Sequence, residues 1–197
     1  MKTVTDITAL LDPSAKYGLA FSGGTDSALL LAALTQACLD VKAYMVFSQF
    51  QAPFELDDAR RVVEETGADF QLIRADVLAR PEVCENPWDR CYWCKRFIFG
   101  TVLEAMEADG RAVLLDGTNA SDDPARRPGF RALAELGVRS PLREAGFTKD
   151  DVRQVSRSLG LWTAEKPNFS CFATKVPEGQ AITQEALDQA ARNLGLK

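Results

Sequence analysis

Two groups of residues in the sequence have side chains and spacing that could support chemistry. The first is the run SGGTDS at residues 22–27, in which two glycines stand between hydroxyl and carboxylate side chains. The second consists of cysteines: Cys91 and Cys94 are spaced as CxxC, and Cys171 follows far downstream. The chain contains no histidine, so acid–base chemistry and metal binding fall to Asp, Glu, Lys, Cys or the substrate itself.

The run at residues 22–27 is typical of a loop that binds phosphate. It lies between a predicted strand and a predicted helix, where glycines let backbone N–H groups turn toward an anion at the helix N-terminus. No Gly-Lys-Ser/Thr follows and the G-x-G-x-x-G spacing is missing, which excludes a Walker A loop and a dinucleotide-binding fingerprint. The alternative is a plain glycine-rich turn with a Ser or Asp helix cap.

The CxxC lies at the start of a predicted helix, beside Arg90, Lys95 and Arg96. Because the helix dipole and these cations favour negative charge, we expect the two cysteines to be thiolates. The pair could be a redox couple, half of a zinc site, or two ligands of an iron–sulfur cluster.

Both a zinc site and a cluster stay open, and the role of Cys84 is undecided. An all-cysteine zinc site would need Cys84 or Cys38 as a fourth ligand beside Cys91, Cys94 and Cys171. Three cysteines instead leave one iron of a cluster open to a transferable sulfur. We expect Cys38 to be a buried thiol on the apolar helix after the phosphate loop.

Hydrophobic periodicity predicts the elements that must position these groups. Short apolar runs at residues 17–21, 43–47, 70–73 and 112–116 predict strands. Helices are predicted over residues 27–34, 54–65, 93–107, 129–136 and 148–159, with a last helix capped by Thr183. Residues 81–90 are expected to be irregular, and residues 162–179 a functional loop.

Alternation of strands and helices predicts an α/β fold, a Rossmann-like doubly wound parallel sheet covered by helices. The run DGTN at residues 116–119 follows a strand, where such a sheet places its ligand loops. We predict one main domain over residues 1–145 and a C-terminal segment of helix and loop over residues 146–197, which carries Cys171.

Composition narrows the class of partner. The 197 residues are 46% hydrophobic, but no apolar run approaches the about 18 residues that a membrane-spanning helix needs. With no leader-like N-terminus, we expect a cytoplasmic protein without a membrane partner. A net charge of −5 repels nucleic-acid backbones, so a small-molecule substrate is favoured, and a homo-oligomer is left open.

The motifs, taken together, resemble a known family. The SGGTDS run is similar to the SGGxDS signature of PP-loop ATP pyrophosphatases, which split ATP into AMP and pyrophosphate. Over residues 17–183 the ordered motifs resemble the LarE-type sulfur transferases, which help to build the nickel-pincer nucleotide cofactor. These motifs are CYWCK at residues 91–95, DGTN at 116–119 with Asp122, RPG at 127–129, SPL at 140–142, and Lys166-Pro167 leading to Cys171.

This resemblance implies a reaction. In the family, ATP adenylylates a carboxylate of a nicotinate-derived mononucleotide, and sulfur then replaces the AMP. Some members give up the sulfur of a cysteine at the position of Cys171 and are left with dehydroalanine. Others bind a [4Fe-4S] cluster through this cysteine and two in the CYxC motif, here Cys91 and Cys94. The sulfur donor is left open.

The resemblance also implies site residues and cofactors. ATP and Mg²⁺ would bind at Ser22, Gly23, Gly24, Thr25, Asp26, Ser27, Phe47, Gly117 and Thr118. Lys95 and Arg127 suit phosphate groups of ATP or of the nucleotide substrate, their alternative being exposed solvated cations. The expected catalytic residues are Cys171, Asp26 and Lys95.

Other functions stay open at this point. One is tRNA thiolation by the same activation chemistry, and another is ligation with ammonia, which leaves the cysteines without a role. The last is a non-catalytic module that binds a nucleotide or zinc, the cysteines being structural. The cofactor alternatives to the cluster are therefore zinc or none.

Overall fold

Four parallel strands form the centre of the fold in the computed structural model, which describes residues 2–196. They are β1 (Tyr17–Ala20), β2 (Val41–Phe47), β3 (Asp69–Arg74) and β4 (Val113–Leu115). Their order in the sheet is β3-β2-β1-β4, and Tyr17 is in register with both Val41 and Val113. Each strand overlaps a predicted apolar run, which confirms those predictions.

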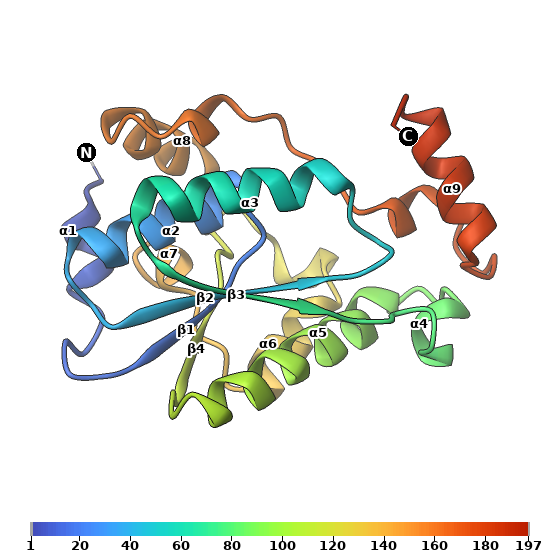
Figure 1. Cartoon of the computed structure of the whole chain (residues 1–197), viewed down its shortest axis with the longest axis horizontal. Helices are drawn as coiled ribbons and strands as arrows, with labels where there is room; N and C mark the ends of the chain where they lie inside the picture. Colours follow the sequence, from blue (N-terminus) through green and yellow to red (C-terminus); the bar gives the residue numbers. More distant parts are fainter. Residues whose placement is uncertain (1, 197) are drawn as a thin grey trace.

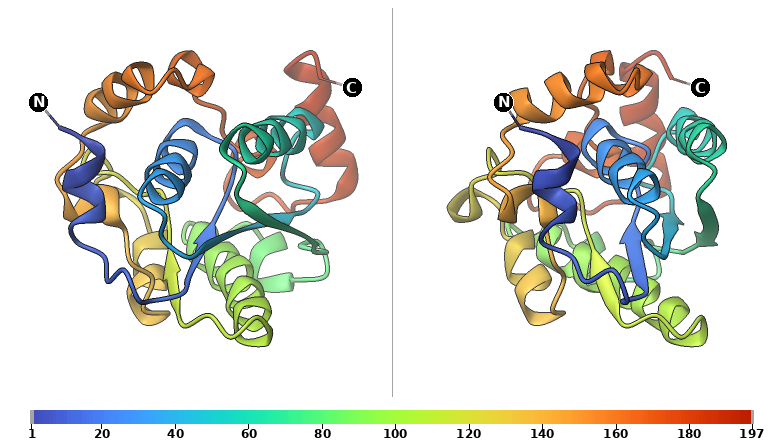
Figure 2. Two further views of the ribbon diagram at one scale, coloured as in Figure 1. Left: turned by 60° about the vertical axis from the view of Figure 1, so that its left-hand side comes forward. Right: turned by 90° about the vertical axis from the view of Figure 1, so that its left-hand side faces the viewer.

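Helices cover both faces of this sheet (Figures 1 and 2). Ala43 and Met45 of β2 face one core, whereas Tyr44 and Val46 face the other, as alternation along a strand requires. The first core packs against α1 (Val4–Thr8), α2 (Thr25–Gln36), α3 (Pro53–Thr66), α7 (Pro141–Glu144) and α8 (Lys149–Ser158). The second face packs against α5 (Arg90–Ala108) and α6 (Gly129–Glu135). The doubly wound α/β prediction is confirmed.

The strand order creates a switch point in the sheet. The chain runs outward from β1 to β2 and β3, and then returns to place β4 on the opposite side of β1. The loops after β1 and β4 therefore leave the sheet side by side at its carboxyl edge. In open α/β sheets this is where ligands bind.

A separate small core lies at one end of the molecule. It is built from α4 (Pro81–Cys84), the 3₁₀ turn η3 (Phe172–Lys175) and α9 (Gln184–Asn193). Asn86 is fully buried there, and its side-chain amide donates hydrogen bonds to the carbonyl oxygens of Val176, Pro177 and Gln180 at 2.7–3.4 Å. One side chain thus attaches the C-terminal segment to the loop before α5.

Some boundaries differ from the predictions. Helix α5 begins at Arg90 rather than near residue 93, so both CxxC cysteines lie on it. Residues 81–90 are not wholly irregular, because α4 begins there at a proline in its first turn. Residues 162–179 contain η3 and a further 3₁₀ turn, η2 (Trp162–Glu165). Thr148 and Thr183 cap α8 and α9 with their side chains, as predicted.

Two further predictions concern the whole chain. The division at residue 145 stays a prediction; Val152 and Val155 of α8, beyond that residue, belong to the first core. Across residues 2–196, no helix has both the length and the apolar character needed to cross a membrane.

The prediction of a buried Cys38 is wrong. Helix α2 ends at Gln36, and Cys38 is exposed in the left-handed region with a φ of 55°. The Cys38 N–H donates to the Thr35 carbonyl at 3.0 Å, and the Leu39 N–H to the Leu34 carbonyl at 3.1 Å. These two bonds define a Schellman motif whose left-handed position favours glycine.

Cys38→Gly should therefore stabilise the protein by about 0.5–1 kcal/mol, because glycine adopts a positive φ without steric cost. Urea unfolding of the variant measures the free energy of unfolding. Cys38→Ala is the matched control, because it removes the thiol but keeps the Cβ atom, and it should leave stability nearly unchanged. Equal stabilisation by both variants would contradict this explanation.

Candidate active site

The loop at residues 22–27 connects β1 to α2 and is open toward a cavity. Gly23 has a φ of +68°, and a Cβ atom there would lie 2.8 Å from the backbone of Ala59 in α3. The N-cap of α2 is Gly24, which forms no side-chain cap hydrogen bond. No Ser or Asp side chain therefore caps the start of the helix, and its first backbone N–H groups can donate hydrogen bonds to an anion.

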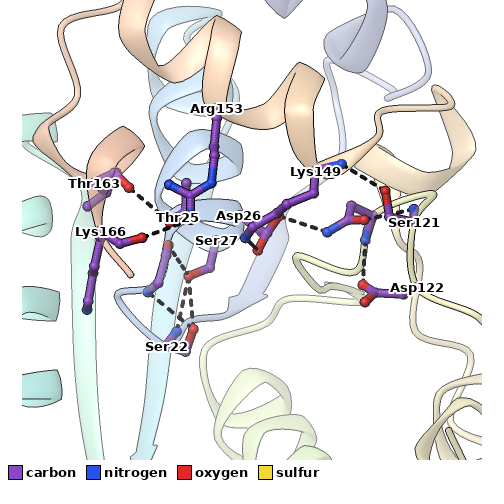
Figure 3. A network of polar contacts seen from close by, with 12 residues as sticks. Ser22, Thr25, Asp26, Ser27, Ser121, Asp122, Lys149, Arg153, Thr163 and Lys166 are labelled. Atoms are coloured by element: carbon purple, nitrogen blue, oxygen red, sulfur yellow. Dashed lines mark hydrogen bonds and ion pairs between the residues drawn. The ribbon is translucent and has the colours of Figure 1, made fainter. Parts of the chain in front are cut away.

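The Asp26 carboxylate joins three elements in one polar network (Figure 3). One oxygen accepts a hydrogen bond from the Asn119 side-chain amide at 2.9 Å, and Asn119 belongs to the loop after β4. The other oxygen lies 2.5 Å from the ammonium of Lys149, the first residue of α8. Both charged side chains retain 24% of their exposure. The network is therefore accessible from the cavity.

The loop after β4 is held against the start of α2. Asp116 is buried, and its carboxylate accepts hydrogen bonds from the hydroxyls of Thr118 at 2.5 Å and Ser140 at 2.6 Å. At Gly117 an added Cβ atom would lie 2.9 Å from the backbone nitrogen of Ser27. Glycine is required there because the two loops touch through their main chains.

Gly117→Ala should destabilise the protein by about 1–3 kcal/mol, because the new methyl group forces two backbone segments apart. Gly100→Ala is the control: a Cβ atom there meets nothing within 4 Å, and α5 should gain up to about 1 kcal/mol. Thermal and urea unfolding measure both variants. An unchanged Gly117→Ala protein would show that the close contact does not hold in solution.

A third segment reaches the phosphate-binding loop from the C-terminal side. The Lys166 ammonium lies 2.6 Å from Asp58 and 3.2 Å from the Gly23 carbonyl oxygen. Arg153 of α8 donates hydrogen bonds to the carbonyl oxygens of Ala164 and Lys166. This segment continues to Cys171, so α8 links the loop after β1 to the third cysteine.

These segments enclose a cavity of about 900 Å³. Eight predicted site residues line it: Ser22, Gly24, Thr25, Asp26, Cys91, Lys95, Thr118 and Arg127. Glu55, Asn119, Asp122, Lys149 and Lys166 also line it, although none was among the predicted site residues. Asn119, Asp122 and Lys166 lay in the motifs that carried the family resemblance, whereas nothing in the sequence distinguished Lys149 from a helix-surface lysine.

The remaining predicted site residues do not line this cavity. Gly23, Ser27 and Gly117 lie behind it as backbone of the two touching loops. Phe47 ends β2 and packs against the first core, with the Arg74 guanidinium 5.8 Å from its ring centre. Its assignment to ATP binding stays a prediction, as do the other residue assignments.

The two predicted phosphate-binding cations differ in their surroundings. Arg127 is 63% exposed and pairs with Asp122 at 2.7 Å. The Lys95 stem passes Gly129 so closely that a Cβ atom there would lie 2.7 Å from it, and its ammonium is 5.5 Å from the centre of the Phe99 ring. Lys95 is thus confined by packing, whereas Arg127 is held by one exposed ion pair.

The three cysteines lie near one another at the far end of the cavity. Cys91 is exposed and lines the cavity, whereas Cys94 and Cys171 pack against the small core. The Arg90 guanidinium donates to the Cys91 sulfur at 3.7 Å and to the carbonyl oxygen of Ala173, two residues after Cys171, at 3.0 Å. Among residues 2–196, no three Cys, Asp or Glu side chains are grouped as ligands of a single metal ion.

The expectation of a thiolate is wrong for Cys94 in the metal-free protein. Burial, and after it the neighbouring Cys171 and Cys91, raise the pKa of Cys94 to about 12. Burial also raises the pKa of Cys171, although Arg90 opposes this. The helix dipole and nearby cations are therefore outweighed by desolvation.

Alkylation should reveal this difference in the metal-free protein. At about pH 8 a thiol with so high a pKa stays protonated, so iodoacetamide should modify exposed Cys38 and Cys91 before half-buried Cys94. Peptide mass spectrometry gives the rate at each cysteine, and the same protein in urea is the control. Equal rates at Cys91 and Cys94 in the folded protein would contradict the burial effect.

The fold and the loop after β1 define a class of protein. A parallel α/β sheet with SGGTDS at its switch point is that of the PP-loop ATP pyrophosphatases. The solved structure of NMN synthetase from Francisella tularensis has this fold, with a TM-score of 0.63, 16% identity, and coverage of 94% of this chain and 79% of that one.

Within this class the chain is 34% identical over 194 residues to pyridinium-3,5-bisthiocarboxylic acid mononucleotide synthase of Lactiplantibacillus plantarum. The match covers 95% of this chain and 68% of that protein. The chain belongs to the family of this synthase, the LarE-type PP-loop sulfur transferases. No protein-family model matches the chain.

Two further relatives show how far the similarity extends. The chain is 35% identical over 175 residues to the uncharacterized protein slr1717 of Synechocystis, covering 88% of this chain and 65% of that protein. It is 24% identical over 192 residues to a tRNA-specific 2-thiouridylase of Fervidobacterium nodosum, with 78% and 54% covered. The chain thus spans about two thirds of the length of its two most similar relatives named here.

Proposed function

We propose that this protein is an ATP-dependent sulfur transferase that adenylylates a carboxylate of a nicotinate-derived mononucleotide and replaces the AMP with sulfur. The observation that carries the proposal is the shared cavity, which is lined by the phosphate-binding loop and by Cys91. A carboxylate held there is within one enclosed space with both a nucleotide and a sulfur source. Activation and transfer then need no movement of the intermediate between sites.

The nucleotide end suits Mg·ATP. Ser22, Thr25 and Asp26 line this part of the cavity, and Mg²⁺ prefers oxygen donors such as the Asp26 carboxylate. Mg²⁺ is commonly bound through one or two carboxylates plus substrate phosphates, so a cage of three acidic residues is not required. Asp26 would hold the ion, which when bound neutralises phosphate charge. The uncapped start of α2 would receive the pyrophosphate portion.

The proposed reaction has two displacements. An oxygen of the acceptor carboxylate attacks the α-phosphorus, the bond to the bridging oxygen of the β-phosphate breaks, and pyrophosphate leaves. Sulfur then attacks the acyl carbon and AMP leaves with the bonding electrons. Lys95 and Arg127 would hold phosphate groups in place. Since the carboxylate is already ionised, the first step requires no histidine base.

The sulfur end suits a [4Fe-4S] cluster held by Cys91, Cys94 and Cys171, with one iron free to hold a transferable sulfide. Each cysteine of such a cluster binds a different iron, so their sulfurs need not converge as they do around one ion. Cys84 does not complete a zinc set as the structure stands, because its thiol is directed at the carbonyl oxygens of Val77 and Leu78 at 3.5 Å. The alternative source is the sulfur of Cys171 itself.

Iron and sulfide analysis tests the sulfur source. The protein purified anaerobically should contain about four irons per chain, and Cys91→Ala, Cys94→Ala and Cys171→Ala should each lose them. Cys38→Ala is the matched control, since Cys38 is exposed and distant in sequence from the set.

Two other results would redirect the proposal. No iron, together with a mass loss equal to hydrogen sulfide in Cys171 after turnover, would replace the cluster with a sacrificial cysteine. Stoichiometric zinc without release of pyrophosphate from ATP would contradict enzymatic sulfur transfer and leave a binding module.

The similarity to a tRNA-specific 2-thiouridylase favours tRNA thiolation as a second candidate. The net charge of −5 weighs against a large polyanionic substrate. Pyrophosphate release distinguishes the two, because only the true acceptor should stimulate it. Stimulation by tRNA and not by a nicotinate mononucleotide would reverse the order of these candidates.

A further inference from the structure

Lys149 pairs with the carboxylate that would hold a divalent cation in the proposed function, Asp26. Its ammonium lies 2.5 Å from one Asp26 oxygen, while Asn119 donates to the other oxygen at 2.9 Å (Figure 3). The carboxylate therefore has a partner on each oxygen. An ammonium and Mg²⁺ repel one another at such short range, so each weakens the binding of the other to this one carboxylate.

The other carboxylates of the cavity are held differently. Asp122 pairs with Arg127 at 2.7 Å and also accepts the backbone N–H of Asn119 at 3.1 Å. Glu55 accepts the backbone N–H of Ala52 at 2.9 Å, in the capping box of α3. These carboxylates support the local backbone. Of these three carboxylates, Asp26 is the one whose ion-pair partner, Lys149, lies on an element far away in the sequence.

Helix α8 fixes the backbone of Lys149, and its side chain extends from there into the cavity. The Lys149 N–H donates to the Ser121 hydroxyl at 3.0 Å, and Val152 is fully buried in the first core. The capping box between Thr148 and Asp151 fixes the start of the helix. The side chain beyond this anchor is a flexible four-carbon stem with a compact charge, and it lines the cavity.

We propose that Lys149 is an exchange cation: it neutralises Asp26 in the free protein and moves to a phosphate oxygen of ATP when Mg²⁺ binds Asp26. This inference rests on the proposed function. Asp26 then discriminates against Mg²⁺ that arrives without a nucleotide, because the ion would have to displace Lys149 with no phosphate to receive it. Metal and nucleotide binding are thereby coupled through one side chain.

Lys149→Met tests the exchange because it predicts changes of opposite sign. Without nucleotide, Mn²⁺ alone should bind the variant more tightly than the wild type, by about tenfold, because Asp26 has lost its competing cation. Mg·ATP should bind the variant about tenfold more weakly, because a phosphate has lost its cation. Mn²⁺ electron paramagnetic resonance and calorimetric titration with Mg·ATP measure the two affinities.

Three variants make the result specific. Lys16→Met removes the same charge from an exposed position outside the cavity and should change neither affinity. Lys149→Arg keeps the charge and should still suppress Mn²⁺ binding. Adding Asp26→Asn to Lys149→Met should abolish the gained Mn²⁺ affinity, which assigns it to Asp26.

The outcomes separate this inference from the proposed function. If Lys149→Met weakens the binding of both Mn²⁺ and Mg·ATP, Lys149 has a structural role; if it changes neither affinity, Lys149 takes no part in binding. Either result shows that the proposed exchange is wrong, while the sulfur-transferase proposal stands. If the wild-type protein binds no Mg·ATP, both are overturned. Opposite changes in the two affinities, absent in Lys16→Met, support the exchange.

Discussion

The site depends on one steric constraint, the contact between the backbones of two loops at the switch point of the sheet. The segment at Gly117 lies so close to Ser27 that any side chain would collide with it. This closeness brings the Asn119 side chain to Asp26. The Arg143 guanidinium holds Asn119 in place by donating a hydrogen bond to the Asn119 carbonyl oxygen at 3.3 Å. The phosphate-binding loop is thus shaped by a neighbour nearly a hundred residues away in the chain.

A second connection runs through α8. Its first residue reaches Asp26, and its Arg153 holds the backbone of the segment that leads to Cys171. Lys166 in that segment returns to the phosphate-binding loop through the Gly23 carbonyl oxygen. The loop at residues 22–27 and the segment that leads to Cys171 are therefore both held by contacts with α8.

Local pattern was sufficient to predict the strands and most helices, because apolar periodicity and capping residues such as Thr148 and Thr183 act over a few positions. It was also sufficient for the loop at residues 22–27, because the positive φ of Gly23 is a local requirement of the backbone. It failed for Cys38, because apolar periodicity does not reveal that this residue takes a left-handed conformation just after the helix ends at Gln36. It missed Lys149, because only the tertiary fold brings α8 against α2.

The small core around Asn86, against which Cys94 and Cys171 pack, is separate from the two cores that flank the sheet. Its apolar residues come from α4, η3 and α9 and from the loops after β2 and β3, and they form a cluster distinct from the two that flank the strands. Such a cluster can open as a cooperative unit with its own free energy, below that of global unfolding. Opening of this unit would bring Cys94 and Cys171 to solvent while β1 and the phosphate-binding loop stayed folded. The fold therefore gives reagents in solution a route to Cys94 and Cys171 that leaves the loop at residues 22–27 intact.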